Sequence, residues 1–225
     1  MKNQVVTESD LPAVGDWVLV KPLELVSMIF KVLTRKNQIS RKVAGKVVKE
    51  QLVAANIDIM FLVMGLNNDF NLRRLERFLF MVTASNSIPV VILNKSDLVA
   101  DAKEKEKKVI KLVGDDAEVH VISALNKSGI DAIRKYLETG VTIALVGSSG
   151  VGKSTIINTL MGEAKLKTAS VREKDGKGRH ITKARELFLI PSGGVMIDNP
   201  GIREVQLWGD PGSLQEVFKD IEALS

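Results

Sequence analysis

The sequence contains no cysteine, which excludes a disulfide framework and a thiolate-bound zinc site within its 225 residues. It also lacks any run of about 18 consecutive apolar residues, the minimum for a membrane-spanning helix. Residues 1–12 are polar and have no apolar stretch typical of a secretory signal. We therefore expect a cytoplasmic protein with no membrane partner.

The composition is that of a globular protein with a buried core, because 45% of residues are hydrophobic and 26% are charged. The length predicts one large domain, or a modest domain with a small additional module. A net charge of +5 and a pI near 9.3 favour polyanionic partners such as nucleic acid. A solvated basic surface would explain the same charge.

Two regimes of sequence divide the chain into a β module, residues 1–50, and a larger domain, residues 51–225. In the first, apolar runs at 17–20 and 28–33 predict strands between turn signals, and a basic polar tract follows at 35–42.

In the larger domain, buried strands alternate with helices. Strands are predicted at residues 57–64, 89–93, 118–122, 141–146, 186–190 and 194–197. Helices are predicted at 71–84, 101–113, 128–137, 153–160 and 212–224, with Ser128 as the cap of the third. This α/β alternation predicts a mostly parallel sheet with helices on both faces.

Residues 147–154 match the phosphate-loop pattern G-x-x-x-x-G-K-[ST], between a predicted strand and a predicted helix. Its glycines let successive backbone N–H groups point at phosphate oxygens, and the positive helix end adds attraction. Lys153 would contact the β- and γ-phosphates, and the Ser154 hydroxyl would bind Mg²⁺. The predicted nucleotide contacts are Gly147, Ser148, Ser149, Gly150, Val151, Gly152, Lys153, Ser154 and Thr155.

A second motif, residues 94–97, predicts selection of guanine. The Asp97 carboxylate can accept hydrogen bonds from N1–H and N2–H₂ of guanine, whereas adenine offers no such pair of donors. The Lys95 stem can lie over the base, and Asn94 can tie the loops together. Because the motif ends a buried strand, it lies where ligands bind in open α/β sheets.

Ser123 and Ala124 end the next predicted strand and supply backbone N–H groups that could reach guanine O6. Three loops at the ends of consecutive strands therefore converge on one nucleotide. The sequence predicts GTP or GDP as the ligand rather than ATP.

The region after the phosphate loop predicts two switch segments. Asp198 would hold Mg²⁺ through a water molecule, and the Gly201 N–H would sense the γ-phosphate. In the polar segment 173–182, Thr182 is the candidate contact to Mg²⁺ and the γ-phosphate. Many GTPases place a water-orienting glutamine after the second switch glycine, but here Ile202 follows Gly201, so we assign that role to His180.

The motifs stand in a circularly permuted order, because residues 94–97 and 123–124 precede the phosphate loop instead of following it. The same sheet can be built in this order if the chain is cut elsewhere and its old ends are joined.

With this order, the chain resembles the circularly permuted GTPases of the RsgA family, which depend on the small ribosomal subunit. Beyond the motifs, the resemblance includes residues 14–17, 51–58, 71–77 and 201–204. It implies an OB-like N-terminal barrel that binds rRNA, GTP hydrolysis stimulated by the 30S subunit, and a role in late 30S maturation. It also implicates a switch histidine, which here is His180.

The resemblance implies a zinc module as well, but this chain has no cysteine to ligate the metal. Only Thr182 remains of the family's threonine-rich first switch, which here reads His180, Ile181, Thr182, Lys183. About 45 residues are few for a five-stranded barrel, so we expect a reduced or incomplete one.

The expected partners are the 30S subunit and its 16S rRNA, contacted by a monomer through the basic tract and the switch surface. One alternative function is a GTP-responsive assembly scaffold with negligible turnover. Another is an ATPase, although Asp97 favours guanine over adenine.

Overall fold

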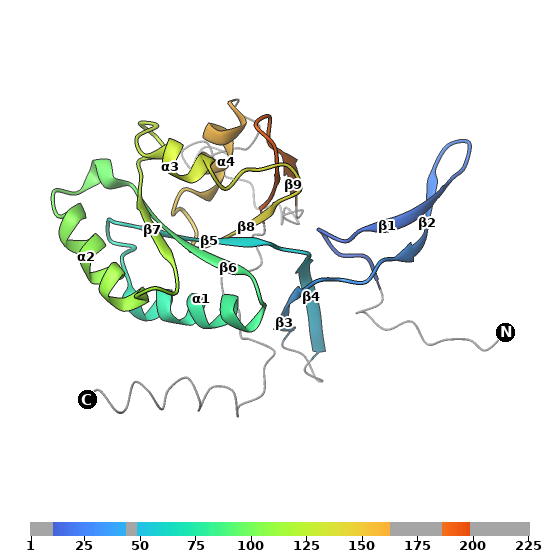
Figure 1. Cartoon of the computed structure of the whole chain (residues 1–225), viewed down its shortest axis with the longest axis horizontal. Helices are drawn as coiled ribbons and strands as arrows, with labels where there is room; N and C mark the ends of the chain where they lie inside the picture. Colours follow the sequence, from blue (N-terminus) through green and yellow to red (C-terminus); the bar gives the residue numbers. More distant parts are fainter. Residues whose placement is uncertain (1–10, 44–48, 163–185, 199–225) are drawn as a thin grey trace, which may run out of the picture.

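The protein is described from a computed structural model, over residues 11–43, 49–162 and 186–198. Its main body is a six-stranded sheet between helices, and an antiparallel hairpin projects from one side (Figure 1). Within these residues, no helix is both long and apolar enough to cross a bilayer.

The central sheet has the order β7-β6-β5-β8-β10-β9. Neighbouring strands are parallel except β9, which runs antiparallel to β10 at one edge. The strands are β5 (Ile59–Gly65), β6 (Ile88–Asn94), β7 (Glu118–Val121), β8 (Thr142–Val146), β9 (Glu186–Leu189) and β10 (Val195–Asp198). The predicted fold class, a mostly parallel sheet in an α/β domain, is therefore confirmed.

Helices cover both faces of the sheet because consecutive strand side chains point to opposite sides. Met60 and Leu62 of β5 pack with α1 (Leu72–Ala84) and α2 (Ala102–Val113). Phe61 of the same strand packs on the other face with α3 (Ile130–Arg134) and α4 (Lys153–Met161).

The third helix differs from its prediction. It covers Ile130–Arg134 rather than residues 128–137, and its N-cap is Gly129 in the left-handed region, not Ser128. Ser128 instead forms an isolated bridge with Ser123, each backbone N–H donating to the other residue's carbonyl. The predicted helix at 212–224 lies outside the described residues.

The N-terminal residues form two separate antiparallel pairs. The strands β1 (Val18–Pro22) and β2 (Ser27–Val32) match two predicted strands to within one or two residues. The strands β3 (Gln38–Val43) and β4 (Lys49–Ala55) were not predicted. Because β4 runs across residue 50 and its Val53 and Ala54 join the core under α1 and α2, the packing continues across the predicted domain boundary.

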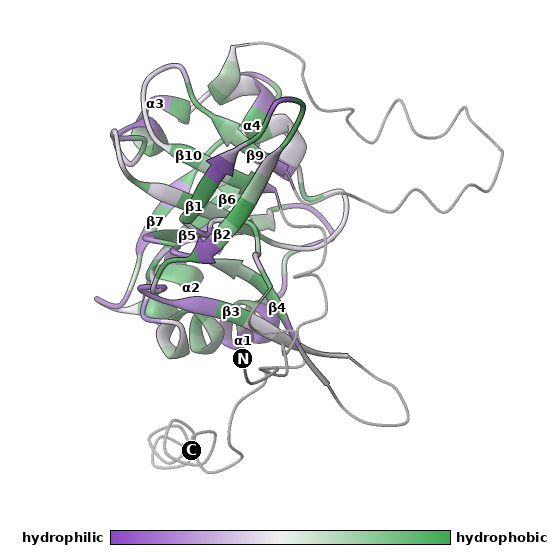
Figure 2. Cartoon of the chain, turned by 90° about the vertical axis from the view of Figure 1, so that its right-hand side faces the viewer, coloured by the Kyte–Doolittle hydropathy of each residue, from purple (hydrophilic) through white to green (hydrophobic). Residues whose placement is uncertain are grey.

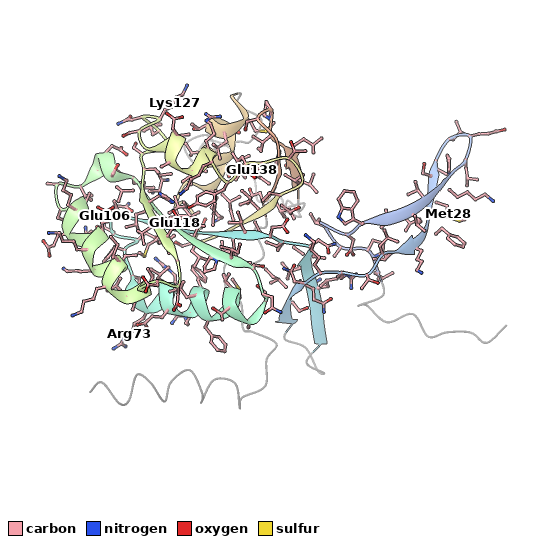
Figure 3. All side chains as sticks on the ribbon, viewed as in Figure 1. Met28, Arg73, Glu106, Glu118, Lys127 and Glu138 are labelled. Carbon is pink, nitrogen blue, oxygen red and sulfur yellow. The ribbon has the colours of Figure 1, made fainter. Side chains whose placement is uncertain are left out.

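The β1–β2 hairpin projects from the body (Figure 1), and much of its ribbon is coloured hydrophobic (Figure 2). Its apolar side chains Leu19, Val20, Met28, Ile29 and Phe30 are exposed. Met28, labelled in Figure 3, is one of them. The described residues show a two-stranded ribbon here, not the closed five-stranded barrel that an OB fold would form.

A polar joint connects the hairpins to the sheet. The Asp16 carboxylate, whose side chain is 1% exposed, accepts two hydrogen bonds from Arg35, from Nε at 2.7 Å and Nη2 at 2.8 Å. The Asn37 side chain pairs with the backbone of Ile57, accepting from its N–H at 2.8 Å and donating to its carbonyl at 2.6 Å. Asn56 Nδ2 donates to the Gly15 carbonyl at 2.9 Å. Short polar side chains thus fix how the N-terminal residues meet the domain.

Burial by itself raises the pKa of the Asp16 carboxyl, but hydrogen bonds from Arg35 and the Ala13 N–H outweigh it and leave the pKa lowered. A lowered carboxyl pKa stabilises the fold above the carboxyl's unfolded-state pKa. This stabilisation is lost as the pH falls through the folded-state value.

We predict that Asp16→Asn lowers the free energy of unfolding at neutral pH by about 3 kcal/mol, because it leaves the Arg35 guanidinium without its counter-ion. The deficit should shrink in acid, where the wild-type carboxyl is protonated as well. Urea unfolding at several pH values measures both effects. The control is Asp131→Asn, whose side chain is 100% exposed and which should change stability by less than about 0.5 kcal/mol. Equal losses in the two variants would contradict the prediction.

Candidate nucleotide-binding site

The predicted site residues gather at one edge of the sheet, because the carboxyl ends of parallel strands lie together. Asn94 is the last residue of β6, and the phosphate loop follows β8. Asp198 ends β10, where it is opposite Leu145 of β8. Ser123 follows β7 by two residues.

Two positions of the phosphate loop, Gly147 and Gly152, have neighbours so close that no side chain would fit there. A Cβ on Gly147 would lie 2.3 Å from the Val63 carbonyl oxygen of β5. A Cβ on Gly152 would lie 2.3 Å from Asn94 Nδ2, and its φ of +106° is one that side chains disfavour. Gly152 is also the N-cap of α4, so the loop delivers the chain directly into the helix.

The Lys153 side chain lies inside the loop, with the residue only 7% exposed. Its ammonium donates to the carbonyl oxygens of Gly147 at 2.7 Å and Ser148 at 2.8 Å. These contacts solvate the cation where a phosphate would bind. A bound phosphate would replace carbonyl oxygens with oxygens of full negative charge.

Asn94 ties the base-side loops to the phosphate loop, as the sequence predicted. Its Nδ2 donates to the Val151 carbonyl at 2.9 Å, and its Oδ1 accepts from the Ala124 N–H at 3.0 Å. The residue is 3% exposed, so both contacts are shielded from water. One amide thus connects three of the predicted loops.

The loop after β6 holds Asp97 against the turn after β7. The Ser123 hydroxyl donates to Asp97 Oδ1 at 2.5 Å, and the Ser96 N–H donates to the Ile122 carbonyl at 3.2 Å. Lys95 has a φ of +66°, an uncommon conformation for a lysine, just before the short 3₁₀ helix η2 (Ser96–Leu98). Such backbone strain is typical of binding loops.

The two N–H groups predicted to reach guanine O6 have partners within the protein. The Ser123 N–H donates to the Ser128 carbonyl at 2.9 Å, and the Ala124 N–H donates to Asn94. The Ser123–Ser128 bridge closes a turn with the exposed Lys127 at its outer end (Figure 3). A base oxygen could use the Ala124 N–H only by sharing it with Asn94.

The residues predicted to hold Mg²⁺ fit this edge in part. Ser154 lies in the first turn of α4 and Asp198 at the end of β10, the strand beside β8. A hydroxyl and a carboxylate are the oxygen ligands that Mg²⁺ prefers. Thr155 follows in α4, whereas Thr182, His180 and Gly201 lie outside the described residues.

Two contacts at the site escaped the sequence prediction. The Thr159 hydroxyl of α4 lies 3.1 Å from the Ala124 carbonyl oxygen and 2.8 Å from the Thr155 carbonyl oxygen, so its one proton is shared between the base-side turn and the helix. Asp69, in the connection between β5 and α1, accepts a hydrogen bond from Ser148 of the phosphate loop. Asp69 could have been suspected from its place after a buried strand, but the sequence does not reveal its partner.

The family model for the RsgA GTPase matches residues 32–208. The chain belongs to this family. Among similar curated proteins is the small ribosomal subunit biogenesis GTPase RsgA of Methanosarcina acetivorans, 48% identical over 93% of this chain and 57% of that protein. The protein of the same name from Opitutus terrae is 44% identical over 99% of this chain and 64% of its own length. The chain therefore spans about three fifths of the length of these relatives.

Solved structures agree with the permuted fold. YjeQ from Thermotoga maritima has a TM-score of 0.69 and 25% identity, over 93% of this chain and 68% of that one. YloQ, described as a circularly permuted GTPase, has a TM-score of 0.61 and 21% identity, over 99% of this chain and 67% of its own, which shows the fold alone.

We predict that Asn94→Ala lowers the free energy of unfolding by about 2–4 kcal/mol, because the Val151 carbonyl and the Ala124 N–H lose a buried partner. Guanine-nucleotide affinity should fall at least about tenfold as the two loops separate. Urea unfolding and titration with a fluorescent GDP measure the two effects. The matched control is Asn126→Ala, because the Asn126 side chain is exposed. If Asn94→Ala has the same stability and nucleotide affinity as this control, the Asn94 hydrogen bonds do not hold the loops together.

Proposed function

We propose that the chain binds GTP and GDP with Mg²⁺ and hydrolyses GTP. The observation that carries the proposal is the Asn94 tie, which holds the guanine motif and the phosphate loop side by side. Membership of the RsgA GTPase family supports the same reading.

Selection of guanine rests on Asp97. Its carboxylate oxygens can accept two hydrogen bonds from the N1–H and N2–H₂ edge, and the Ser123 hydroxyl fixes the orientation of the group. Adenine would leave the carboxylate without these donors, so ATP should compete poorly. The Lys95 stem would lie over the base plane.

Catalysis would consist of positioning and charge stabilisation, as is general for phosphoryl transfer. The backbone N–H groups of residues 147–152 and the Lys153 ammonium would hold the phosphates. Bound Mg²⁺ would neutralise charge on the β- and γ-phosphates, with Ser154, Thr182 and Asp198 as its protein contacts. We assign orientation of the attacking water to His180 and sensing of the γ-phosphate to the Gly201 N–H.

We further propose that the chain acts in the cytoplasm, as a monomer, in maturation of the small ribosomal subunit, with the 30S particle and its 16S rRNA as partners. The names of the relatives and the net charge of +5 support this proposal. A zinc ion, expected for the family, has no cysteine ligand in this chain.

Two of the cations in the basic tract, residues 35–42, pair with carboxylates of the protein itself. Arg35 is committed to the buried Asp16, and Lys36 Nζ lies 3.0 Å from Asp58 Oδ1. Replacing Arg35 would break the joint described above instead of testing RNA contact. A charge-reversal test of the tract must therefore leave Arg35 in place.

We expect GTP hydrolysis by this chain to be stimulated by purified 30S subunits and abolished by Lys153→Ala, because the ammonium stabilises charge on the phosphates. Phosphate release under multiple turnover, with and without 30S subunits, measures this. Tight GTP binding with negligible turnover in both conditions would favour the scaffold alternative.

We expect Asp97→Asn to weaken GTP binding at least about tenfold and to improve binding of XTP. Xanthine carries a carbonyl oxygen in place of the guanine amino group, and an amide can donate to it where a carboxylate cannot. Competition between the two nucleotides for each protein measures the change. An unchanged preference for GTP would remove Asp97 from base recognition.

A further inference from the structure

Asp69 lies in the connection between β5 and α1 and gathers donors from three parts of the chain. Its Oδ2 accepts from the Gly65 N–H at 3.1 Å, at the end of β5. Its Oδ1 accepts from the Ser148 hydroxyl at 2.5 Å and from Arg74 Nη2 of α1 at 2.8 Å. Arg74 Nη2 also donates to the Asp69 carbonyl. One carboxylate thus joins the central strand, the first helix and the phosphate loop.

Ser148 is held at both ends. Its hydroxyl donates to Asp69, and its carbonyl oxygen accepts from Lys153 at 2.8 Å. A phosphate would compete with this carbonyl for the Lys153 ammonium, whereas the contact between Ser148 and Asp69 does not involve the lysine. The Asp69 bond can therefore hold this part of the loop with or without a phosphate on Lys153.

A carboxylate beside a phosphate site would repel the ligand unless its charge were compensated. Here the Arg74 guanidinium lies 2.8 Å from Oδ1, with the side chains of Arg74 and Asp69 only 24% and 20% exposed. The pair is electrically neutral, so the carboxylate can hold the loop with little charge penalty toward the phosphates.

We propose that Asp69 is a positioning residue that, through the Ser148 hydroxyl, holds the first half of the phosphate loop in the shape that receives a nucleotide. The inference rests on the proposed binding of guanine nucleotide at this loop. A loop held in its bound shape loses less conformational freedom on binding, so the contact raises affinity without touching the ligand. The reacting atoms are contacted by other groups, so hydrolysis of GTP already bound should not need Asp69.

Two variants of equal shape isolate the hydroxyl. Ser148→Thr keeps the donor, whereas Ser148→Val has the same size and lacks it. We expect Ser148→Val to bind GDP about tenfold more weakly than Ser148→Thr, the effect of one hydrogen bond to a charged group. Ser148→Thr should restore GDP affinity to within about twofold of wild type, a rescue by the conservative change that general damage to the loop would not allow.

A double-mutant cycle tests whether Asp69 acts through Ser148. Asp69→Ala, Ser148→Ala and the double variant Asp69→Ala/Ser148→Ala should each bind GDP about tenfold more weakly than wild type, because the second change removes a group that has already lost its partner. The control for the change in net charge is Asp115→Ala. Asp115 is exposed in the turn before β7, at the opposite edge of the sheet, so this variant should bind GDP as wild type does.

The positioning role of Asp69 and the proposed binding of guanine nucleotide can fail separately in these measurements. Equal GDP affinity of Ser148→Val and Ser148→Thr overturns the positioning role while leaving nucleotide binding intact, and so do losses that multiply to about a hundredfold in the double variant. Failure of the wild-type chain to bind GDP overturns the proposed function and this inference together. If Asp69→Ala does not fold, the Ser148 pair decides the question alone.

Discussion

The buried side-chain amide of Asn94 is the constraint on which the site depends. It is the one group among the described residues shown to bond both the turn after β7 and the phosphate loop after β8. These two segments leave strands that are not neighbours, since β6 and β5 lie between them. Without this link, the distance between the proposed base site and the proposed phosphate site would depend only on loop packing. Asn94 is only 3% exposed and bonds through both its amide nitrogen and its amide oxygen, so it fixes that distance.

Much of this arrangement could be predicted from the sequence because the relevant signals are local. Strands buried on both faces are continuous apolar runs, as at β5, β6 and β8, and glycine patterns mark the phosphate loop. The tie through Asn94 was predicted because its motif ends a strand at the ligand edge of a parallel sheet. Parallel topology then brings distant motifs together without further information.

The rest could not be predicted because it depends on partners far away in the sequence. The strand β3 reads as a basic polar tract, and only its pairing with β4 makes it a strand. Arg35 reads as a surface cation, but the structure pairs it with a buried carboxylate 19 residues away. Asp69 and Ser148 are separated by 79 residues, so no local pattern connects them. Ser128 is a residue type that often caps helices, but here its backbone forms a bridge with Ser123, and Gly129 is the cap of α3.

The strand order has a consequence for how the protein is made. The strands β5, β6 and β7 are successive in the chain and adjacent in the sheet, so they can pair as soon as they leave the ribosome. The strand β8 is synthesised later and must then pair with the open side of β5, where Ile143 meets Ile59. The proposed guanine motif after β6 therefore leaves the ribosome before the proposed phosphate loop after β8. The strands β9 and β10, the second of which ends in Asp198, are synthesised after β8. The edge proposed to bind the phosphates and Mg²⁺ is therefore completed last.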